Sequence, residues 1–347
     1  MLTSMRIALV AASIAFAQLA AAASGPLASG KITRYDPALD AVIAPDASIE
    51  KLAEGFTWAE GPAWIEAGRY LLFTDVPQNI MYRWSAANGA EVFLQPSGYA
   101  GPPIAGVREA GANGLFADGP GFLLLADSGT RAVVRLNLET RKRETLVSSY
   151  RGKRLNSPND VIRTRDGTVF FTDPPYGLAN LDASPLKEQK VNGVYRIGRN
   201  GAAELVDGEL SFPNGLALSP DQRTLYVSNS DKTKPIWMAY SLNERAEVSG
   251  KRVFADATDL ISDSTPGSPD GIKVAASGHL FASAPGGILI MTPEGKRLGR
   301  IETGDAIANC AFGDDGRTLY LTSHKILARV RLKVGVSPPA PAAGTGS

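Results

Sequence analysis

The sequence predicts an all-β protein, a six-bladed β-propeller, and three observations lead to that fold class. One hairpin-like pattern occurs six times along the 347 residues. Glycine (36 residues) and proline (23) are abundant, which favours many turns and short strands over long helices. No heptads or long stretches of 3.6-residue periodicity compete with the strand pattern. Repeats of about 40 to 55 residues, each with about four strands, are typical of propeller blades.

The six repeats share one internal order. Each begins with a polar residue, continues through a small residue and a short apolar run, turns, and ends in a second apolar or aromatic run. The turn is Arg165-Asp-Gly167 in the third repeat and Asp314-Asp-Gly316 in the sixth, as in β-hairpins. The repeats span residues 60–75, 113–127, 159–173, 214–229, 270–284 and 309–323. Further strands are predicted between them at 132–138, 193–197 and 288–292.

Both ends of the chain are predicted to lie outside the propeller domain, which we place at residues 24–334. Residues 1–23 indicate a signal peptide, with one positive charge, an apolar run and small residues at its end. We therefore expect an exported protein, periplasmic or secreted, with no membrane segment after signal removal. A membrane anchor or a retained N-terminal helix is the alternative. Residues 335–347, rich in proline, alanine and glycine, predict a disordered tail.

Charge and cysteine content exclude some classes of function. The formal net charge is +1, so no basic field would attract nucleic acid. The single cysteine, Cys310, rules out a disulfide within the chain. Its apolar neighbours indicate a buried core residue rather than a reactive thiol. The sequence does not predict an oligomeric state.

The polar residue that opens each repeat leads to a prediction about function. In a propeller, the innermost strand of each blade lines a central tunnel. If the first strand of each hairpin is innermost, these side chains gather at one mouth of that tunnel. They are Glu60, Asn113, Asn159, Asn214, Asp270 and Asn309, called the ring residues below. Carboxylate and amide oxygens, without thiolate or imidazole, suit a hard divalent cation such as Ca²⁺, Mg²⁺ or Mn²⁺.

A plainer interpretation is that the Asn-Gly and Asp-Gly dipeptides are turn residues at strand starts. It does not account for Glu60, or for Asn159, which is followed by Asp160. Other catalytic arrangements are weakly indicated. The two histidines, His279 and His324, lie outside the phase of the ring, and no G-x-S-x-G nucleophile motif is present.

Four motifs occur in order between residues 54 and 331. They are Glu60-Gly-Pro-Ala-Trp64, Leu155-Asn-Ser-Pro-Asn-Asp160 with Phe171-Thr-Asp-Pro-Pro-Tyr-Gly177, Phe212-Pro-Asn-Gly-Leu216, and Pro269-Asp-Gly271. Together they resemble the gluconolactonase family, which includes regucalcin (senescence marker protein), and in particular its bacterial gluconolactonase branch. The resemblance implies a six-bladed propeller enzyme, a carboxylic ester hydrolase that opens a small sugar-type lactone with one divalent cation in the tunnel.

The resemblance also implies roles for single residues. Glu60, Asn214 and Asp270 match the family's metal ligands, and Asn159 matches a residue that contacts metal or substrate. Ca²⁺ is the first candidate, with Mn²⁺, Mg²⁺ and Zn²⁺ as others. Asp270 is implied as the general acid/base, while the metal polarises the lactone carbonyl.

Substrate contacts are expected from three side chains. The amides of Asn113 and Asn159 suit sugar hydroxyls, and Tyr176 lies in the loop after the third repeat. Ser157 stands where animal members of the family carry a substrate-binding arginine, so sugar recognition is expected to differ. Two alternatives stay open: a non-enzymatic propeller that binds a cation or partner, and an esterase or organophosphate hydrolase on the same fold.

Overall fold

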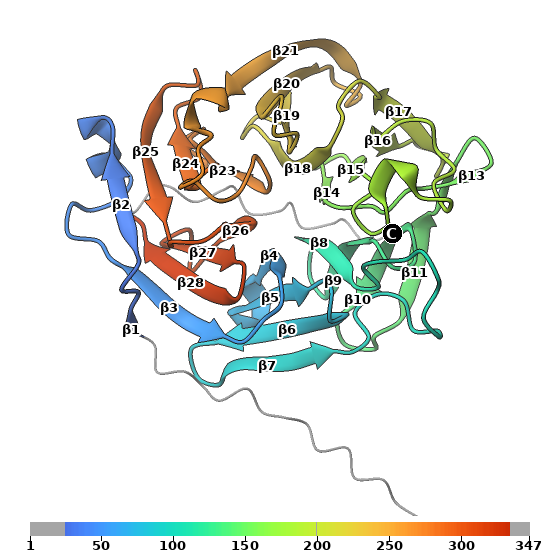
Figure 1. Ribbon diagram of the computed structural model, residues 1–347, viewed down its shortest axis with the longest axis horizontal. Helices are drawn as coiled ribbons and strands as arrows, with labels where there is room; N and C mark the ends of the chain where they lie inside the picture. The colour runs from blue at the N-terminus through green and yellow to red at the C-terminus, as the bar shows by residue number, and fades with distance from the viewer. Residues whose placement is uncertain (1–24, 199, 334–347) are drawn as a thin grey trace, which may run out of the picture.

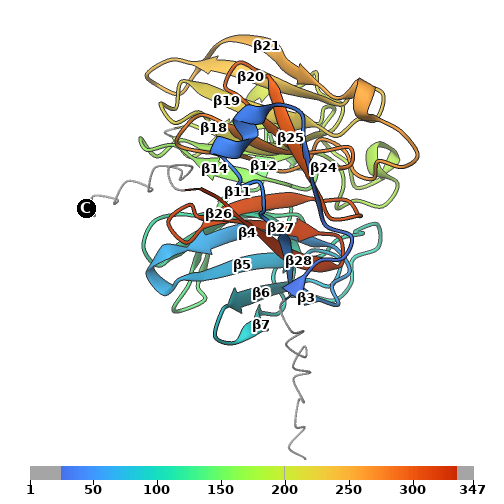
Figure 2. The ribbon, with the colours of Figure 1, turned by 90° about the vertical axis from the view of Figure 1, so that its left-hand side faces the viewer.

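A computed structural model describes residues 25–198 and 200–333 of the chain. The predicted signal peptide (1–23) and the predicted tail (335–347) lie outside the described residues. Within the described ranges, six antiparallel sheets of four or five strands surround one axis (Figure 1). The side view places the last strands, in red, beside the blue strands of the first blade (Figure 2). The predicted all-β, six-bladed propeller is confirmed.

Every predicted repeat forms the two inner strands of one blade. The innermost strands are β4 (Ala59–Ile65), β8 (Ala112–Ala117), β14 (Val161–Arg163), β18 (Pro213–Leu218), β22 (Ile272–Val274) and β26 (Asn309–Gly313). Their hairpin partners are β5 (Tyr70–Asp75), β9 (Phe122–Asp127), β15 (Val169–Asp173), β19 (Thr224–Asn229), β23 (Leu280–Ala284) and β27 (Thr318–Ser323). We number the blades one to six in this order.

Two outer strands complete each blade. The third strands are β6 (Ile80–Ser85), β10 (Ala132–Asn137), β16 (Gly193–Ile197), β20 (Ile236–Leu242), β24 (Gly287–Met291) and β28 (Ile326–Arg331). The fourth strands are β7 (Gly89–Leu94), β11 (Arg143–Val147), β17 (Ala203–Asp207), β21 (Val248–Asp256), β25 (Arg297–Glu302) and β3 (Ile49–Glu54). The further strands predicted between the repeats are confirmed as β10, β16 and β24.

The sixth blade joins the two ends of the described chain. Its fourth strand, β3, comes from before the first blade and pairs with β28, with Ala53 opposite Leu327. An ion pair between Arg329 Nη2 and Glu50 Oε2, 2.6 Å apart, reinforces this pairing. Short additions are β1 (Gly25–Pro26) on β3, β2 (Lys31–Arg34) on β25, the hairpin β12 (Ser149–Tyr150) and β13 (Lys153–Arg154), and the 3₁₀ helices η1 (Pro37–Ala41), η2 (Glu66–Gly68), η3 (Leu181–Ala183) and η4 (Thr258–Leu260).

The apolar core lies between neighbouring blades. Between the first two blades, Leu72 packs with Leu115 and Leu125. Between the last and the first, Leu327 packs with Phe73, and Trp64 stacks on Tyr320 with ring centroids 5.4 Å apart. Full burial of a side chain of this size contributes about 1.5–3 kcal/mol, so these seams hold the ring of blades together.

Two further observations bear on the sequence predictions. Cys310 is fully buried, and burial raises the pKa of its thiol to about 12, which confirms the core assignment. Across the described residues, no helix has the length and apolar character needed to cross a bilayer.

Candidate active site

The six ring residues meet at one end of the tunnel, because each lies at or just before the start of an innermost strand. Blade-to-blade hydrogen bonds fix this arrangement. In most blades, a hydroxyl near the end of the second strand donates to a backbone carbonyl of the next blade's ring segment. These bonds are Thr74 Oγ1 to Asn113 O (3.0 Å), Thr172 Oγ1 to Asn214 O (2.7 Å), Ser228 Oγ to Asp270 O (2.5 Å) and Ser283 Oγ to Ala308 O (2.9 Å). In the second blade, Ser128 Oγ, just after the second strand, donates to Pro158 O at 2.8 Å, and the Gly114 amide donates to Asn159 O at 2.7 Å.

The residue that follows this hydroxyl-bearing residue accepts a backbone amide within its own blade. The carboxylate of Asp75 accepts the amide of Thr57 at 2.8 Å, and Asp173 accepts that of Asn156 at 2.7 Å. Asn229 does the same for Phe212 at 2.9 Å. Each closes the loop that leads into the first strand of its own blade. The recurrent Thr-Asp or Ser-Asn pair therefore explains why the repeats end as they do.

Local backbone geometry aims several ring side chains into the tunnel. The pairing register shifts between Glu60 and Ala63, and between Pro213 and Leu216, so Glu60 and Asn214 lie at β-bulges. A bulge bends its strand and redirects a side chain. Glu60 and Asn214 are 3% and 5% exposed.

Two of the glycines that follow ring residues, Gly215 and Gly271, serve close packing rather than turns. A Cβ on Gly215 would lie 2.2 Å from Asp270 O, and one on Gly271 would lie 2.1 Å from Asn309 Cγ. Neither glycine has a positive φ, so neither needs the left-handed conformation that glycine favours in turns. The interpretation of these dipeptides as turn residues therefore does not hold at these two positions.

Three ring residues keep one oxygen free. Glu60 Oε2 accepts the Gly61 amide at 2.7 Å and Asn309 Nδ2 at 3.2 Å, and no bond from the described residues engages Oε1. Asn214 Nδ2 donates to Ser230 Oγ at 2.9 Å, which leaves its carbonyl oxygen facing away from that serine. Asp270 Oδ1 is buried without a hydrogen-bond partner in the described structure. Such an orphaned buried oxygen is unfavourable unless a ligand satisfies it.

The other three ring residues differ among themselves. Asn309 is fully used, because its Oδ1 also accepts Lys273 Nζ at 3.1 Å and the Cys310 amide at 2.9 Å. It orients Glu60 instead of facing the lumen. Asn113 and Asn159 are 6% and 5% exposed, and no described side chain bonds to either amide group. Their amides remain available to a ligand.

Buried charge dominates the electrostatics of the site. Burial raises the pKa of Glu60 to about 7, and the charge of Asp160 adds to this rise. For Asp270, burial and then the charges of Glu60 and Asp160 raise the pKa well above its usual range. The positive charge of Lys273 opposes these shifts and lowers the pKa of Glu60 and Asp160. One ammonium thus faces three carboxylates.

Sequence reasoning missed two members of this group. Asp160 is 3% exposed, and its two oxygens accept the amides of Val161 and Leu216 at 2.9 and 3.0 Å. It therefore fastens the third blade to the fourth. Lys273 comes three positions after Asp270 on the innermost strand. The sequence carries a signal for each residue. Asp160 stands at the position after the ring residue, where four of the repeats have glycine. Lys273 is a charged residue at a position where the other repeats have apolar residues.

Tyr176 and Ser157 lie in the loop region above the ring. The Tyr176 ring stacks on Phe212 at 5.6 Å, and the polar groups of Ser230 and Asn214 act on its hydroxyl by lowering its pKa. Burial raises the pKa of Tyr176. Ser157 Oγ donates to Pro174 O at 2.6 Å and accepts the Gly177 amide at 2.8 Å. Ser157 thus fixes the loop that carries Tyr176 and does not face a substrate.

The donors present fit a hard divalent cation. Glu60, Asn214 and Asp270 leave carboxylate or amide oxygens without protein partners, and the carboxylates lack matching positive charge. Within the described ranges, no group of three or more His, Cys, Asp and Glu side chains is arranged to hold a metal. Among the candidate ligands, only Glu60 and Asp270 belong to these four residue types. Asn214 contributes an amide oxygen instead.

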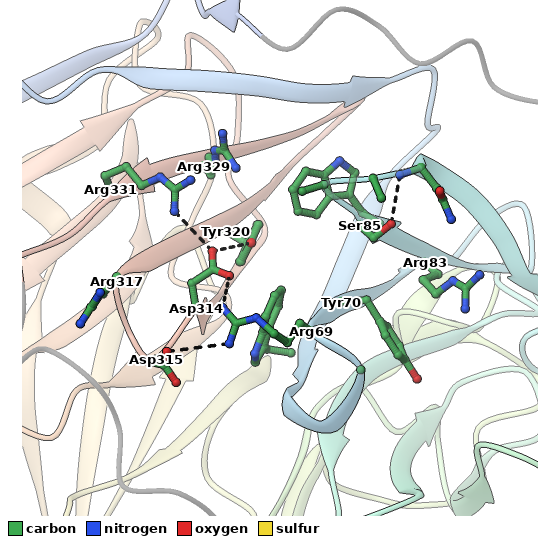
Figure 3. Close-up of a pocket in the computed structure, with 16 residues that line it drawn as sticks. Arg69, Tyr70, Arg83, Ser85, Asp314, Asp315, Arg317, Tyr320, Arg329 and Arg331 are labelled. Carbon is green, nitrogen blue, oxygen red and sulfur yellow. Dashed lines mark hydrogen bonds and ion pairs between the residues drawn. The ribbon is translucent and has the colours of Figure 1, made fainter.

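A separate cleft of about 720 Å³ opens on the opposite face, between the last and first blades (Figure 3). Arg69 and Arg331 extend toward Asp314 there, with N–O distances of 3.3 and 3.4 Å. Trp64 and Tyr320 also line it. No ring residue lines this cleft, so it is not part of the candidate active site.

Comparisons with known proteins place these observations in a family. Residues 58–325 match the SMP-30/Gluconolactonase/LRE-like region. A gluconolactonase of Zymomonas mobilis is 45% identical over 308 residues, which are 88% of this chain and 86% of that protein. The structure of a Xanthomonas campestris gluconolactonase is similar with a TM-score of 0.77 and 31% identity, over 90% of this chain and 98% of the other. The calcium-binding protein regucalcin of Agrobacterium tumefaciens shares the fold (TM-score 0.62, 18% identity, 82% and 93% covered).

The buried carboxylates predict how stability depends on pH. Folding raises the pKa of Glu60 from 4.5 to about 7, so the folded chain binds this proton more tightly than the unfolded chain. In cation-free protein, this contribution is present below about pH 4.5 and is lost as pH rises through about 7. The unfolding free energy of the parent protein should therefore fall between about pH 5 and 8. In Glu60→Gln, we expect this fall to be smaller by on the order of 1–2 kcal/mol.

Urea unfolding of both proteins in chelator, followed by circular dichroism, measures this difference. Comparing variants cancels the opposite contribution of His279, whose pKa burial lowers. Equal pH slopes for the two proteins would contradict the buried, proton-binding state of Glu60.

Proposed function

The chain belongs to the SMP-30/gluconolactonase/LRE-like family of lactone-hydrolysing enzymes, and we propose that it hydrolyses a small sugar-type lactone with one divalent cation held by the ring residues. The family predicted from the motifs is thereby confirmed, and the chain is a carboxylic ester hydrolase rather than a non-enzymatic scaffold. The observation that carries the cation proposal is the orphaned Oδ1 of Asp270 beside the second buried carboxylate, Glu60.

Glu60, Asn214 and Asp270 would hold the cation, with Asn159 as a further contact. A cation held there supplies Lewis-acid polarisation of the lactone carbonyl. Ca²⁺ is favoured because all candidate donors are oxygens, and they come from separate blades; Mn²⁺, Mg²⁺ and Zn²⁺ are the other candidates. Bonds from Gly61, Asn309 and Ser230 keep the Glu60 and Asn214 oxygens oriented before any ligand arrives.

Asp270 is the proposed general acid/base. As a carboxylate, it accepts a proton from water while the water oxygen bonds to the lactone carbonyl carbon. The ring C–O bond then breaks, and Asp270 returns the proton to the departing alkoxide oxygen, so atoms and charge balance. The charges of Glu60 and Asp160 make Asp270 a stronger base than an exposed aspartate. The neighbouring amide of Asn214 lowers the pKa of Asp270 and so offsets part of this rise.

Three residues are proposed to orient the substrate. Asn113 and Asn159 present unused amides at the mouth, each of which offers donors and an acceptor to ring hydroxyls. Tyr176 lies above Asn214 and covers the site from the side of the third blade. Positioning by these groups lowers the entropic part of the barrier.

Removal of the cation tests the proposal directly. We expect exhaustive dialysis against EDTA to reduce hydrolysis of D-glucono-1,5-lactone at least about a hundredfold, because the carbonyl loses its polarising charge. Added Ca²⁺ should restore the rate in a pH-stat assay, with Mn²⁺, Mg²⁺ and Zn²⁺ compared in parallel. Full activity in protein shown to be metal-free by elemental analysis would reject the cation. Hydrolysis of aryl esters or phosphotriesters but no lactone would reject the substrate class.

Replacement of the proposed acid/base separates chemistry from folding. Asp270→Asn should lower kcat by about 10²–10⁴-fold, the usual contribution of general acid/base catalysis. The cation-free variant should be at least as stable as the parent, because a buried charge repelled by Glu60 and Asp160 is gone. Asp231→Asn, at a half-buried aspartate that accepts a bond from Ser211, serves as the control. A kcat above a tenth of the parent value would remove Asp270 from this role.

We also propose that residues 1–23 are a signal peptide and that the mature protein begins near Ser24 and acts outside the cytoplasm. The charge, apolar run and small residues of this segment support the proposal. Expression of the full chain in a Gram-negative host should yield a periplasmic protein whose N-terminal sequence starts near Ser24. An uncleaved N-terminus in the cytosolic fraction would argue against export.

A further inference from the structure

A long loop reaches the tunnel mouth beside the ring residues. It covers residues 95–111 and connects β7 to β8. The amides of Arg108 and Glu109 both donate to Gly177 O, at 2.8 and 3.2 Å, and Val107 forms a β-bridge with Leu178. Because Gly177 follows Tyr176 directly, the loop is docked against the segment that covers the site.

The docked loop carries a carboxylate with one partner. The Glu109 side chain is 16% exposed, and its Oε1 lies 2.7 Å from Arg108 Nη2. In the described chain, no other side chain pairs with Glu109. Arg108 is 49% exposed and so leaves most of its guanidinium open. Both side chains act on the site: the charge of Glu109 raises the pKa of Asp270, and that of Arg108 lowers the pKa of Tyr176.

This pairing has spare hydrogen-bonding capacity at the mouth. An ionised carboxylate can accept about four hydrogen bonds, and a guanidinium can donate five. The Arg108–Glu109 contact uses one of each. A ligand with several hydroxyls can donate to Glu109 and accept from Arg108, whereas an anionic ligand would be repelled by Glu109, Asp270 and Glu60. The geometry thus favours a neutral polyol.

The usual alternative is that Arg108 and Glu109 only hold the loop. The contacts do not support this, because the backbone amides of the two residues do the docking and, among the described residues, their side chains bond only to each other. The loop is also held at its base, where Arg143 donates to Ser97 O at 2.5 Å and Gly98 O at 2.6 Å.

Building on the proposed lactonase function, we propose that Glu109, with Arg108, is a specificity-determining residue that binds the hydroxyl groups of the substrate ring and selects polyhydroxylated lactones over unsubstituted ones. The residues that recognise the substrate would then come from the loop that enters the second blade. Ser157 would not be one of them, because its hydrogen bonds hold the loop that carries Tyr176.

The test compares two six-membered lactones: D-glucono-1,5-lactone, which carries ring hydroxyls and a hydroxymethyl group, and δ-valerolactone, which carries neither. For Glu109→Gln, the ratio of kcat/KM for the hydroxylated to the plain lactone should fall at least about tenfold, mainly through KM, as expected for loss of a charge-assisted hydrogen bond. Glu66→Gln is the control, since Glu66 also pairs with a nearby arginine, Arg69, at 3.5 Å, but on the opposite face. Its ratio should equal that of the parent.

A charge-swapped double variant, Arg108→Glu with Glu109→Arg, separates recognition from loop docking. It keeps an ion pair but moves the carboxylate to the exposed position, so the ratio should stay low. Restoration of the parent ratio would show that only the ion pair matters and would overturn the proposal.

Binding of a ring polyol without an ester, 1,5-anhydro-D-glucitol, gives a readout that does not need hydrolysis. Calorimetry should show at least about fivefold weaker binding to Glu109→Gln than to the parent. Weaker binding without hydrolysis by the parent would refute the lactonase function and support Glu109 as a polyol contact. Hydrolysis of both lactones by the parent, with an unchanged ratio and unchanged binding in the variant, would refute the role of Glu109 and leave the lactonase function standing.

Discussion

The burial of three carboxylates around one ammonium at the hub is the constraint on which the rest of the site depends. Glu60, Asp160 and Asp270 repel one another where water cannot screen them, and Lys273 balances only one of the charges. Amides hold two of these carboxylates: Glu60 accepts bonds from Gly61 and Asn309, and Asp160 accepts bonds from Val161 and Leu216. The negative charge that remains unbalanced attracts cations to one mouth of the tunnel.

The propeller supplies this hub by repeating one hydrogen-bonding arrangement. A hydroxyl on the second strand reaches the next blade, and the acidic or amide residue after it closes its own blade's entry loop. Because these contacts use backbone carbonyls and amides, they position a ring residue whatever its side chain is. The side chains at the mouth are therefore free to differ from blade to blade, and the blades need only agree in phase.

The fold and the convergence of the ring could be predicted from sequence, since both follow from the phase of a repeat. The roles within the ring could not. Asn309 opens the sixth repeat as Asn113 opens the second. Hydrogen bonds with Lys273 and Glu60 occupy the Asn309 amide, whereas no described side chain bonds to the Asn113 amide. That difference arises from a side chain on the neighbouring blade. Glu109 was also missed, because it lies in a connecting loop without a repeat, and only the bonds to Gly177 bring it to the mouth.

The pairing of β3 with β28 has a consequence for how the chain comes to be made. Glu50 and Arg329 are 279 positions apart, so the edge of β3 that pairs with β28 stays unpaired until nearly the whole polypeptide has left the ribosome. During that time its edge is open to pairing with other nascent chains, a known route to aggregation. Glu60 lies in β4, the next strand after β3, and Asn309 begins β26 of the blade that β3 completes. The contact between them can form only when the circle closes, so a prematurely terminated product would lack both the closure and an oriented Glu60.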